Sequence, residues 1–170
     1  MVRKVTSRKY EKEIRPRIKL YKFENLSEDV QEKIINSEIE FREDILLDDL
    51  SQVGTDILTE YLVKNGIEFE STPKVTSWDL SENYIHFKFS GQYKKYYIDY
   101  NSESYSDAES ADIPEKIYYK FLDIVDKAKK EALKAMKADY NYSTDPEYIK
   151  RDLIEQGNLY TVNGEFKEQG

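Results

Sequence analysis

The stretch YIHFKFSGQYKKYYIDY, residues 84–100, carries the pattern that decides the fold of this chain. In its first half Ile85, Phe87 and Phe89 alternate with polar side chains, which indicates a β-strand with one buried face. We expect a second strand after it, with Gly91 in the hairpin turn between the two. Further candidate strands precede this stretch at residues 67–70 and 74–80. Together these segments predict an antiparallel meander.

Helical patterns lie on both sides of this β region. Apolar residues recur at helical spacing over residues 30–41 and 45–64, as two helices joined near residues 42–44 or as one bent helix. A long amphipathic helix is predicted from about Ile113 to Asp139. The chain therefore places helices before and after the sheet.

Short-range signals mark the ends of these elements. Ser27 is the expected N-cap of the first helical region, and Gly66 suits the end of that region because glycine accepts the left-handed conformation. A strand is expected at residues 18–23, and Asn163-Gly164 predicts a C-terminal β-hairpin. Segregated strands and helices favour an α+β fold, with an antiparallel meander packed against amphipathic helices. We expect one domain over residues 18–170, preceded by a basic arm at residues 1–17.

Charge is distributed unevenly along the chain. The net charge is −8 over 170 residues, yet residues 1–22 hold nine Lys and Arg against two Glu, a local net of +7. The rest of the chain is strongly acidic, which argues against binding a phosphate backbone with the whole surface. Nucleic acid is therefore expected to bind only through residues 1–22, if at all. The chain has no Cys and no apolar run long enough to cross a membrane, so we expect neither disulfides nor a membrane partner.

No motif for catalysis or for a cofactor stands out. His86 is the only histidine, so a multi-histidine metal site is excluded. Glu40, Asp44 and Asp48 follow one another at four-residue spacing on one helix face, which suits a Mg²⁺ or Ca²⁺ site or an ordinary solvated face. We expect that the protein is not an enzyme and that it binds no metal or cofactor. We interpret the row of acids as a surface that binds a partner.

Tyrosines and acids gather at the end of the meander. Tyrosine offers a rigid ring with a polar tip and is enriched where proteins bind one another. Alternation predicts that Tyr93 and Tyr97 share one strand face and that Tyr96 and Tyr100 share the other, so that one pair packs and the other is exposed. The candidate partner-binding residues in this region are Tyr96, Tyr97, Asp99, Tyr100, Glu103, Tyr105 and Asp107.

Three stretches resemble a loosely defined group of small, uncharacterised bacteriophage-encoded proteins. They are LYKFENLSEDVQEKI at residues 20–34, the segment at residues 145–158, and LYTVNGEF at residues 159–166. The group often carries a Gly-rich loop where this chain has LSENY at residues 80–84, so any role of that loop is not carried over. The group supplies no common activity, and no functional residues are transferred.

The resemblance implies a phage or prophage origin and a bacterial cytoplasm. With the acidity and the tyrosines, it leads us to expect a protein-binding inhibitor of a bacterial defence system or another host factor, including an anti-CRISPR protein or a nucleic-acid mimic. The alternatives are a regulatory protein that contacts nucleic acid through its basic arm, and an antitoxin-like binding protein.

Overall fold

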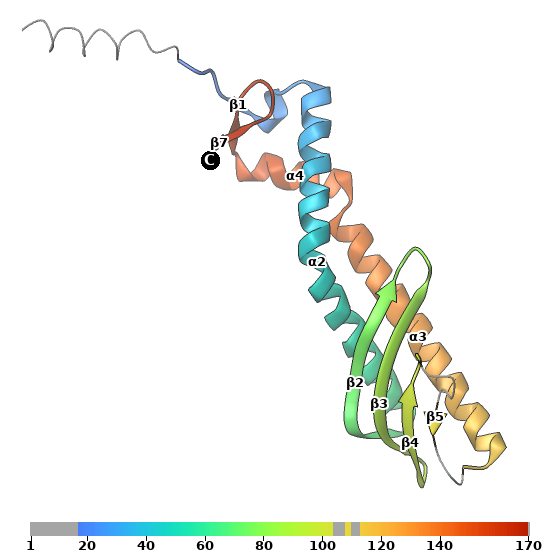
Figure 1. The fold of residues 1–170 in the computed structure, drawn as a ribbon. Coiled ribbons are helices and arrows are strands. Elements are labelled where there is room, and N and C mark those ends of the chain that lie inside the picture. The colour runs from blue at the N-terminus through green and yellow to red at the C-terminus, as the bar shows by residue number, and fades with distance from the viewer. Residues whose placement is uncertain (1–16, 104–107, 110–112, 170) are drawn as a thin grey trace, which may run out of the picture. The chain divides into compact units, whose positions relative to one another are not determined.

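The structure is a computed structural model that describes residues 17–103, 108–109 and 113–169 (Figure 1). Contacts divide the chain into two compact units. The terminal unit comprises Met1–Ile39 and Pro146–Gly170, and the central unit comprises Glu40–Asp145. Among the described residues, helices and antiparallel strands are segregated along the chain, which confirms the predicted α+β class. That the units fold together as a single domain stays a prediction.

Helix α2 (Glu28–Lys64) is one continuous helix that belongs to both units. It begins where the sequence predicts, because the Val30 N–H donates to the Ser27 hydroxyl oxygen at 3.4 Å. It ends before Gly66, which has a φ of +94°. The two helical patterns of the sequence are therefore parts of one helix, without a break at residues 42–44.

The central unit contains the predicted meander. Strands β2 (Ile67–Asp79), β3 (Tyr84–Tyr93), β4 (Tyr96–Asn101) and β5 (Ala108–Glu109) form an antiparallel sheet in the order β2-β3-β4-β5. The two candidate strands before residue 84 are one long strand, β2, with three irregularities in its register against β3. Strand β2 lies at one edge of this sheet, next to α2 in Figure 1.

Gly91 is not in a turn, which corrects the sequence prediction. It lies inside β3, opposite Phe69 on one side and Ile98 on the other. A Cβ at this position would collide with the Glu68 carbonyl group, so the glycine permits a close approach of β2. The actual hairpin turn is made by Lys94 and Lys95, and Lys94 adopts a φ of 58°.

One face of this sheet packs on α2 and on α3 (Glu115–Ser143). Gly54 of α2 lies close to both neighbours, since a Cβ there would meet the Met136 Sδ at 2.8 Å and the Ile85 Cδ1 at 3.2 Å. The core of this unit consists of aliphatic and aromatic side chains from the sheet and both helices, among them Leu50, Leu58, Phe87, Tyr100, Phe121 and Met136. The other face of the sheet is left to polar side chains.

The terminal unit is built around a smaller core. It contains β1 (Tyr21–Lys22), the 3-10 helix η1 (Phe23–Asn25), the first turns of α2, helix α4 (Pro146–Gln156), and strands β6 (Leu159–Tyr160) and β7 (Phe166–Glu168). Its sheet has the order β1-β6-β7. The predicted C-terminal hairpin is confirmed, with Gly164 at a φ of +89° and its N–H donating to the Thr161 carbonyl at 2.9 Å. The buried residues of this core are Phe23, Leu26, Ile149, Leu153 and Tyr160.

A search of the described residues finds no helix with the length and apolar character that a bilayer crossing requires.

Candidate functional site

The solvent face of the central sheet carries several of the predicted site residues. Tyr97 is 47% exposed and pairs across the strands with Gln92, while the exposed Asp99 pairs with Ser90. Glu103 is also exposed and accepts a hydrogen bond from the Ser77 hydroxyl at 3.0 Å. Tyr97 and Asp99 alternate with buried residues along β4, so they share one face of the sheet, and Glu103 lies in the turn after the strand.

The predicted grouping of the tyrosines is wrong in one respect. Tyr93 is buried and Tyr97 is exposed, because the Lys94-Lys95 turn separates them and reverses the alternation. Tyr93 instead pairs with Tyr96, which is half-buried. Tyr96 and Tyr100 do share a face, and Tyr100 lies in the core with 1% of its surface exposed. Tyr105 and Asp107 lie outside the described residues.

Helix α2 presents the second predicted group at the surface of the central unit. Glu40, Asp44 and Asp48 are all exposed, one helical turn apart along one face. Within the described part of the chain none of the three forms an ion pair. Nor does any group of three or more acidic or histidine side chains among the described residues have the arrangement of a metal site.

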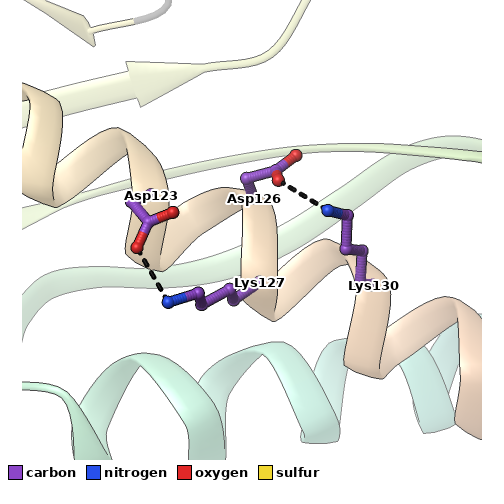
Figure 2. Close-up of polar contacts among 4 residues, drawn as sticks. All are labelled: Asp123, Asp126, Lys127 and Lys130. Carbon is purple, nitrogen blue, oxygen red and sulfur yellow. Dashed lines mark ion pairs between the residues drawn. The ribbon is translucent and has the colours of Figure 1, made fainter.

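Acids on helix α3 are arranged differently. Figure 2 shows that Lys127 pairs with Asp123 at 2.9 Å and Lys130 pairs with Asp126 at 3.2 Å. Each pair joins residues one turn apart, which neutralises the charge locally. Glu40, Asp44 and Asp48 on α2 make no such pair among the described residues, so their charges are not neutralised in this way.

Large apolar side chains lie among the α2 acids, which the sequence reasoning did not anticipate. Phe41 is 58% exposed and Ile45 is 53% exposed, one turn apart beside Asp44 and Asp48. Phe41 is one of the apolar residues that recur at helical spacing over residues 30–41, yet its side chain is exposed in the structure. Exposed apolar groups with a polar rim are typical of protein interaction sites. We call the group formed by Glu40, Phe41, Asp44, Ile45 and Asp48 the α2 surface.

A groove begins where the α2 surface meets the sheet. It has a volume of about 540 Å³, and its walls come from one stretch of α2 and one stretch of β2 with the turn that follows. The Trp78 indole N–H donates to the Ser51 hydroxyl at 2.7 Å and so ties β2 to α2 at this point. The lining residues are Leu47, Asp48, Ser51, Val75, Thr76, Ser77, Trp78, Asp79 and Leu80. We call this cleft the α2–β2 groove.

Hydrogen bonds fix both the charge and the position of Asp79 at the end of the groove. Its Oδ1 accepts bonds from the Ser81 hydroxyl at 2.6 Å, the Ser81 N–H at 2.9 Å and the Glu82 N–H at 3.0 Å. The bonds from the Ser81 hydroxyl and the Glu82 N–H lower the pKa of the Asp79 carboxyl, so this group is an anion at neutral pH. The turn after β2 is thereby held in place, with Asn83 at a φ of 60°.

His86 lies on the solvent face of the sheet, as its place in the strand predicts. Its ring packs against Tyr84 with centroids 4.8 Å apart, and its partly buried position leaves Nδ1 without a hydrogen-bond partner. No orienting carboxylate contacts it within the described residues, so the arrangement of a general base is not formed.

The terminal unit has a cavity of its own. It has a volume of about 450 Å³ and lies between α2, α4 and the C-terminal hairpin. Tyr160 lies at its wall, and burial raises the pKa of this phenol. The other polar side chains around the cavity include Lys33, Glu38, Gln156, Asn158 and Asn163.

No protein-family model, curated protein or solved structure matches this chain. The resemblance to bacteriophage proteins therefore stays a prediction.

Proposed function

We propose that this chain is a protein-binding inhibitor that uses the α2 surface to capture a component of a bacterial defence system or another host factor. The observation that carries this proposal is the side-by-side exposure of Phe41 and Ile45 with three carboxylates that make no ion pair among the described residues. The phage origin rests on the sequence resemblance alone.

The apolar pair supplies the expected affinity. Burying a large aliphatic or aromatic side chain is worth about 1.5–3 kcal/mol, and here two such side chains lie one helical turn apart. An exposed ion pair contributes only about 0.2–1 kcal/mol. Phe41 and Ile45 are therefore the expected anchors, and the acids set the charge of the partner.

The spacing of the acids favours a protein partner over close imitation of a DNA duplex. Residues four apart on a helix rise about 6 Å, whereas duplex DNA carries one charge per about 1.7 Å of its axis. The row formed by Glu40, Asp44 and Asp48 therefore has less than a third of the charge per unit length of duplex DNA. A basic patch on a protein requires no such density.

A plating assay tests this proposal. Bacterial strains that each carry one defined nuclease-based defence system would express either this chain or a variant, and phage plating efficiency would be measured. We expect the chain to raise plating efficiency in at least one strain by about ten-fold or more. Phe41→Ser with Ile45→Ser should abolish the increase, because loss of an interface anchor costs about 1–2 kcal/mol or more at each position.

The matched control is Val63→Ser, which removes an exposed apolar side chain from the last turn of the same helix, outside the α2 surface. This variant should retain the full increase in plating efficiency. A panel in which no strain is relieved, or in which the control loses as much as the double variant, contradicts the proposal.

The basic segment at residues 1–22 supports a second candidate, a regulatory protein that contacts nucleic acid. Nine Lys and Arg against two Glu form a local charge of +7. Binding through this segment should weaken steeply with salt, because each neutralised phosphate releases counterions. Gel-shift assays at about 50 mM and about 200 mM salt, with and without residues 1–22, test this candidate. If the chain without residues 1–22 binds DNA and RNA as tightly as the full chain does, this second candidate is ruled out.

A further inference from the structure

Strand β2 is an open edge of the central sheet. Nine of its 13 residues pair with β3 on one side, and no other described strand pairs with the opposite side. Such an edge presents backbone N–H and C=O groups that another extended chain can use. The three register irregularities interrupt this edge, so a short guest segment fits it better than a long one.

The α2–β2 groove runs along this open edge. Six consecutive residues, 75–80, line it. Successive side chains of a strand point to opposite faces, so a groove that followed only one face would be lined by alternate residues. The run includes the register shift between Val75 and Ser77 and extends past the end of β2 at Asp79, so the groove follows the last part of this edge strand and the start of the turn after it. The opposite wall is helical and is formed by Leu47, Asp48 and Ser51.

The chemistry of the groove specifies the side chains of an occupant. Two carboxylates, Asp48 and Asp79, line it together with no Lys or Arg. Leu47, Val75, Trp78 and Leu80 supply apolar contact surface. Trp78 is partly exposed, and indole is the aromatic ring that attracts cations most strongly. An extended chain that alternates basic and apolar side chains would match both sets.

We propose that the α2–β2 groove binds an extended, basic segment of the partner protein, which adds to β2 as an extra strand. Apolar side chains of the segment contact Trp78, and its Lys or Arg side chains face Asp48 and Asp79. The uninterrupted register at this end of β2 covers residues 77–79, so the guest pairs over roughly three residues at about 3.3 Å per residue. This inference rests on the proposed function. The groove and the α2 surface share Asp48, and the lining of the groove indicates the chemistry of the partner segment.

Trp78 makes the groove directly observable, since it is the only tryptophan of the chain. The probe is an acetylated, amidated heptapeptide in which lysine and valine alternate, titrated into the full chain at about 20 mM salt. We expect a saturable blue shift of the tryptophan emission at peptide concentrations below about 1 mM. Asp48→Lys should weaken binding about ten-fold, because it replaces attraction by repulsion.

Two controls separate strand addition from simple charge attraction. Asp126→Lys changes the charge equally on α3, away from the groove lining, and should alter the affinity less than about two-fold. A lysine-valine peptide that is N-methylated at every residue keeps all charges but loses its backbone donors, and it should bind at least about ten-fold more weakly.

Several results would overturn the inference. These are an emission spectrum unchanged by the lysine-valine peptide, equal binding of a glutamate-valine peptide, and equal binding of the N-methylated peptide. A blue shift that develops without peptide as the protein concentration rises, together with a doubled mass in light scattering, would identify a second copy of the chain as the occupant instead.

The peptide titration and the plating assay fail independently. If the peptide does not bind while Phe41→Ser with Ile45→Ser still abolishes plating relief, strand addition is wrong and the inhibitor role stands. If the peptide binds as expected while no strain is relieved, the groove is a strand-binding site and the inhibitor role is wrong.

Discussion

Substitution of Gly91 by alanine tests how tightly β2 and β3 are held together. A Cβ at this position would lie 3.0 Å from the Glu68 carbonyl carbon and 3.0 Å from the Phe69 Cα, with the Glu68 carbonyl oxygen closer still. All three are backbone atoms of a paired strand, so they cannot rotate aside as a side chain would. The two strands must separate locally, and overpacking of this kind costs about 1–3 kcal/mol.

Gly54→Ala provides the matched comparison. The added Cβ would lie 2.8 Å from the Met136 Sδ, which belongs to a flexible side chain. Alanine is also about 1 kcal/mol more favourable than glycine inside a helix. The gain in helix propensity offsets the cost of moving Met136, so this variant should stay within about 1 kcal/mol of the wild type.

Urea unfolding followed by far-UV circular dichroism measures both variants under the same conditions. We expect Gly91→Ala to lower the free energy of unfolding by about 2 kcal/mol more than Gly54→Ala, with equal denaturant dependence. If Gly91→Ala is as stable as the wild type, or more stable than Gly54→Ala, the close approach of the two strands is not a constraint and the reasoning fails.

Three further predictions address local features of the fold. Tyr140 donates a hydrogen bond to the Glu43 carboxylate at 2.7 Å, so Tyr140→Phe should lower the free energy of unfolding by about 1 kcal/mol at pH 7 in the same urea assay. This hydrogen bond raises the pKa of Tyr140 in the folded state, so its stabilisation is complete below the unfolded pKa of about 10 and is lost as the pH rises through the folded pKa. Raising the pH above 10 should therefore lower the free energy of unfolding of Tyr140→Phe by less than that of the wild type. Lys94→Gly should raise the melting temperature by the equivalent of about 0.5 kcal/mol, because Lys94 has a φ of 58° in the hairpin turn. Gly164→Ala should destabilise the terminal unit by about 1–3 kcal/mol, since this glycine has a φ of +89° and a Cβ there would lie 2.9 Å from the Val30 Cγ1. Amide hydrogen exchange in β6 and β7 measures this last effect.

Local chemistry explains which parts of the fold could be predicted. The Ser27 cap, the glycine after α2 and the Asn163-Gly164 hairpin each depend on a few neighbouring residues, and all three are confirmed. The turn between β3 and β4 could not be predicted in the same way, because Lys94-Lys95 lacks the glycine or asparagine typical of a two-residue hairpin. Gly91 was assigned to that turn because glycine marks both turns and close backbone approaches, and the sequence does not distinguish the two.

The candidate site was predicted only in part, for a related reason. The four-residue spacing of Glu40, Asp44 and Asp48 fixes their common helix face, which the structure confirms as exposed. Helical spacing also placed Phe41 on an apolar stripe, but spacing alone does not show where along a helix the packed neighbours begin. Trp78 and Asp48 are 30 positions apart in the sequence and line one groove only because β2 approaches α2. Such a pairing is a property of the fold and has no local signal.

Charge and apolar contact have separate consequences at the α2 surface. Adjacent carboxylates in the row are about 6 Å apart along the helix axis, which is less than the screening length of about 8 Å at physiological salt, so a partner meets their combined field. Such a field increases the rate of encounter with a basic partner and falls with added salt. Phe41 and Ile45 contribute through burial, which salt does not screen, and so they set the lifetime of the complex. Reversal of the charges of Asp44 and Asp48 by substitution should therefore slow association with the partner and remove the salt dependence of the association rate. Phe41→Ser with Ile45→Ser should instead speed dissociation of the complex at every salt concentration.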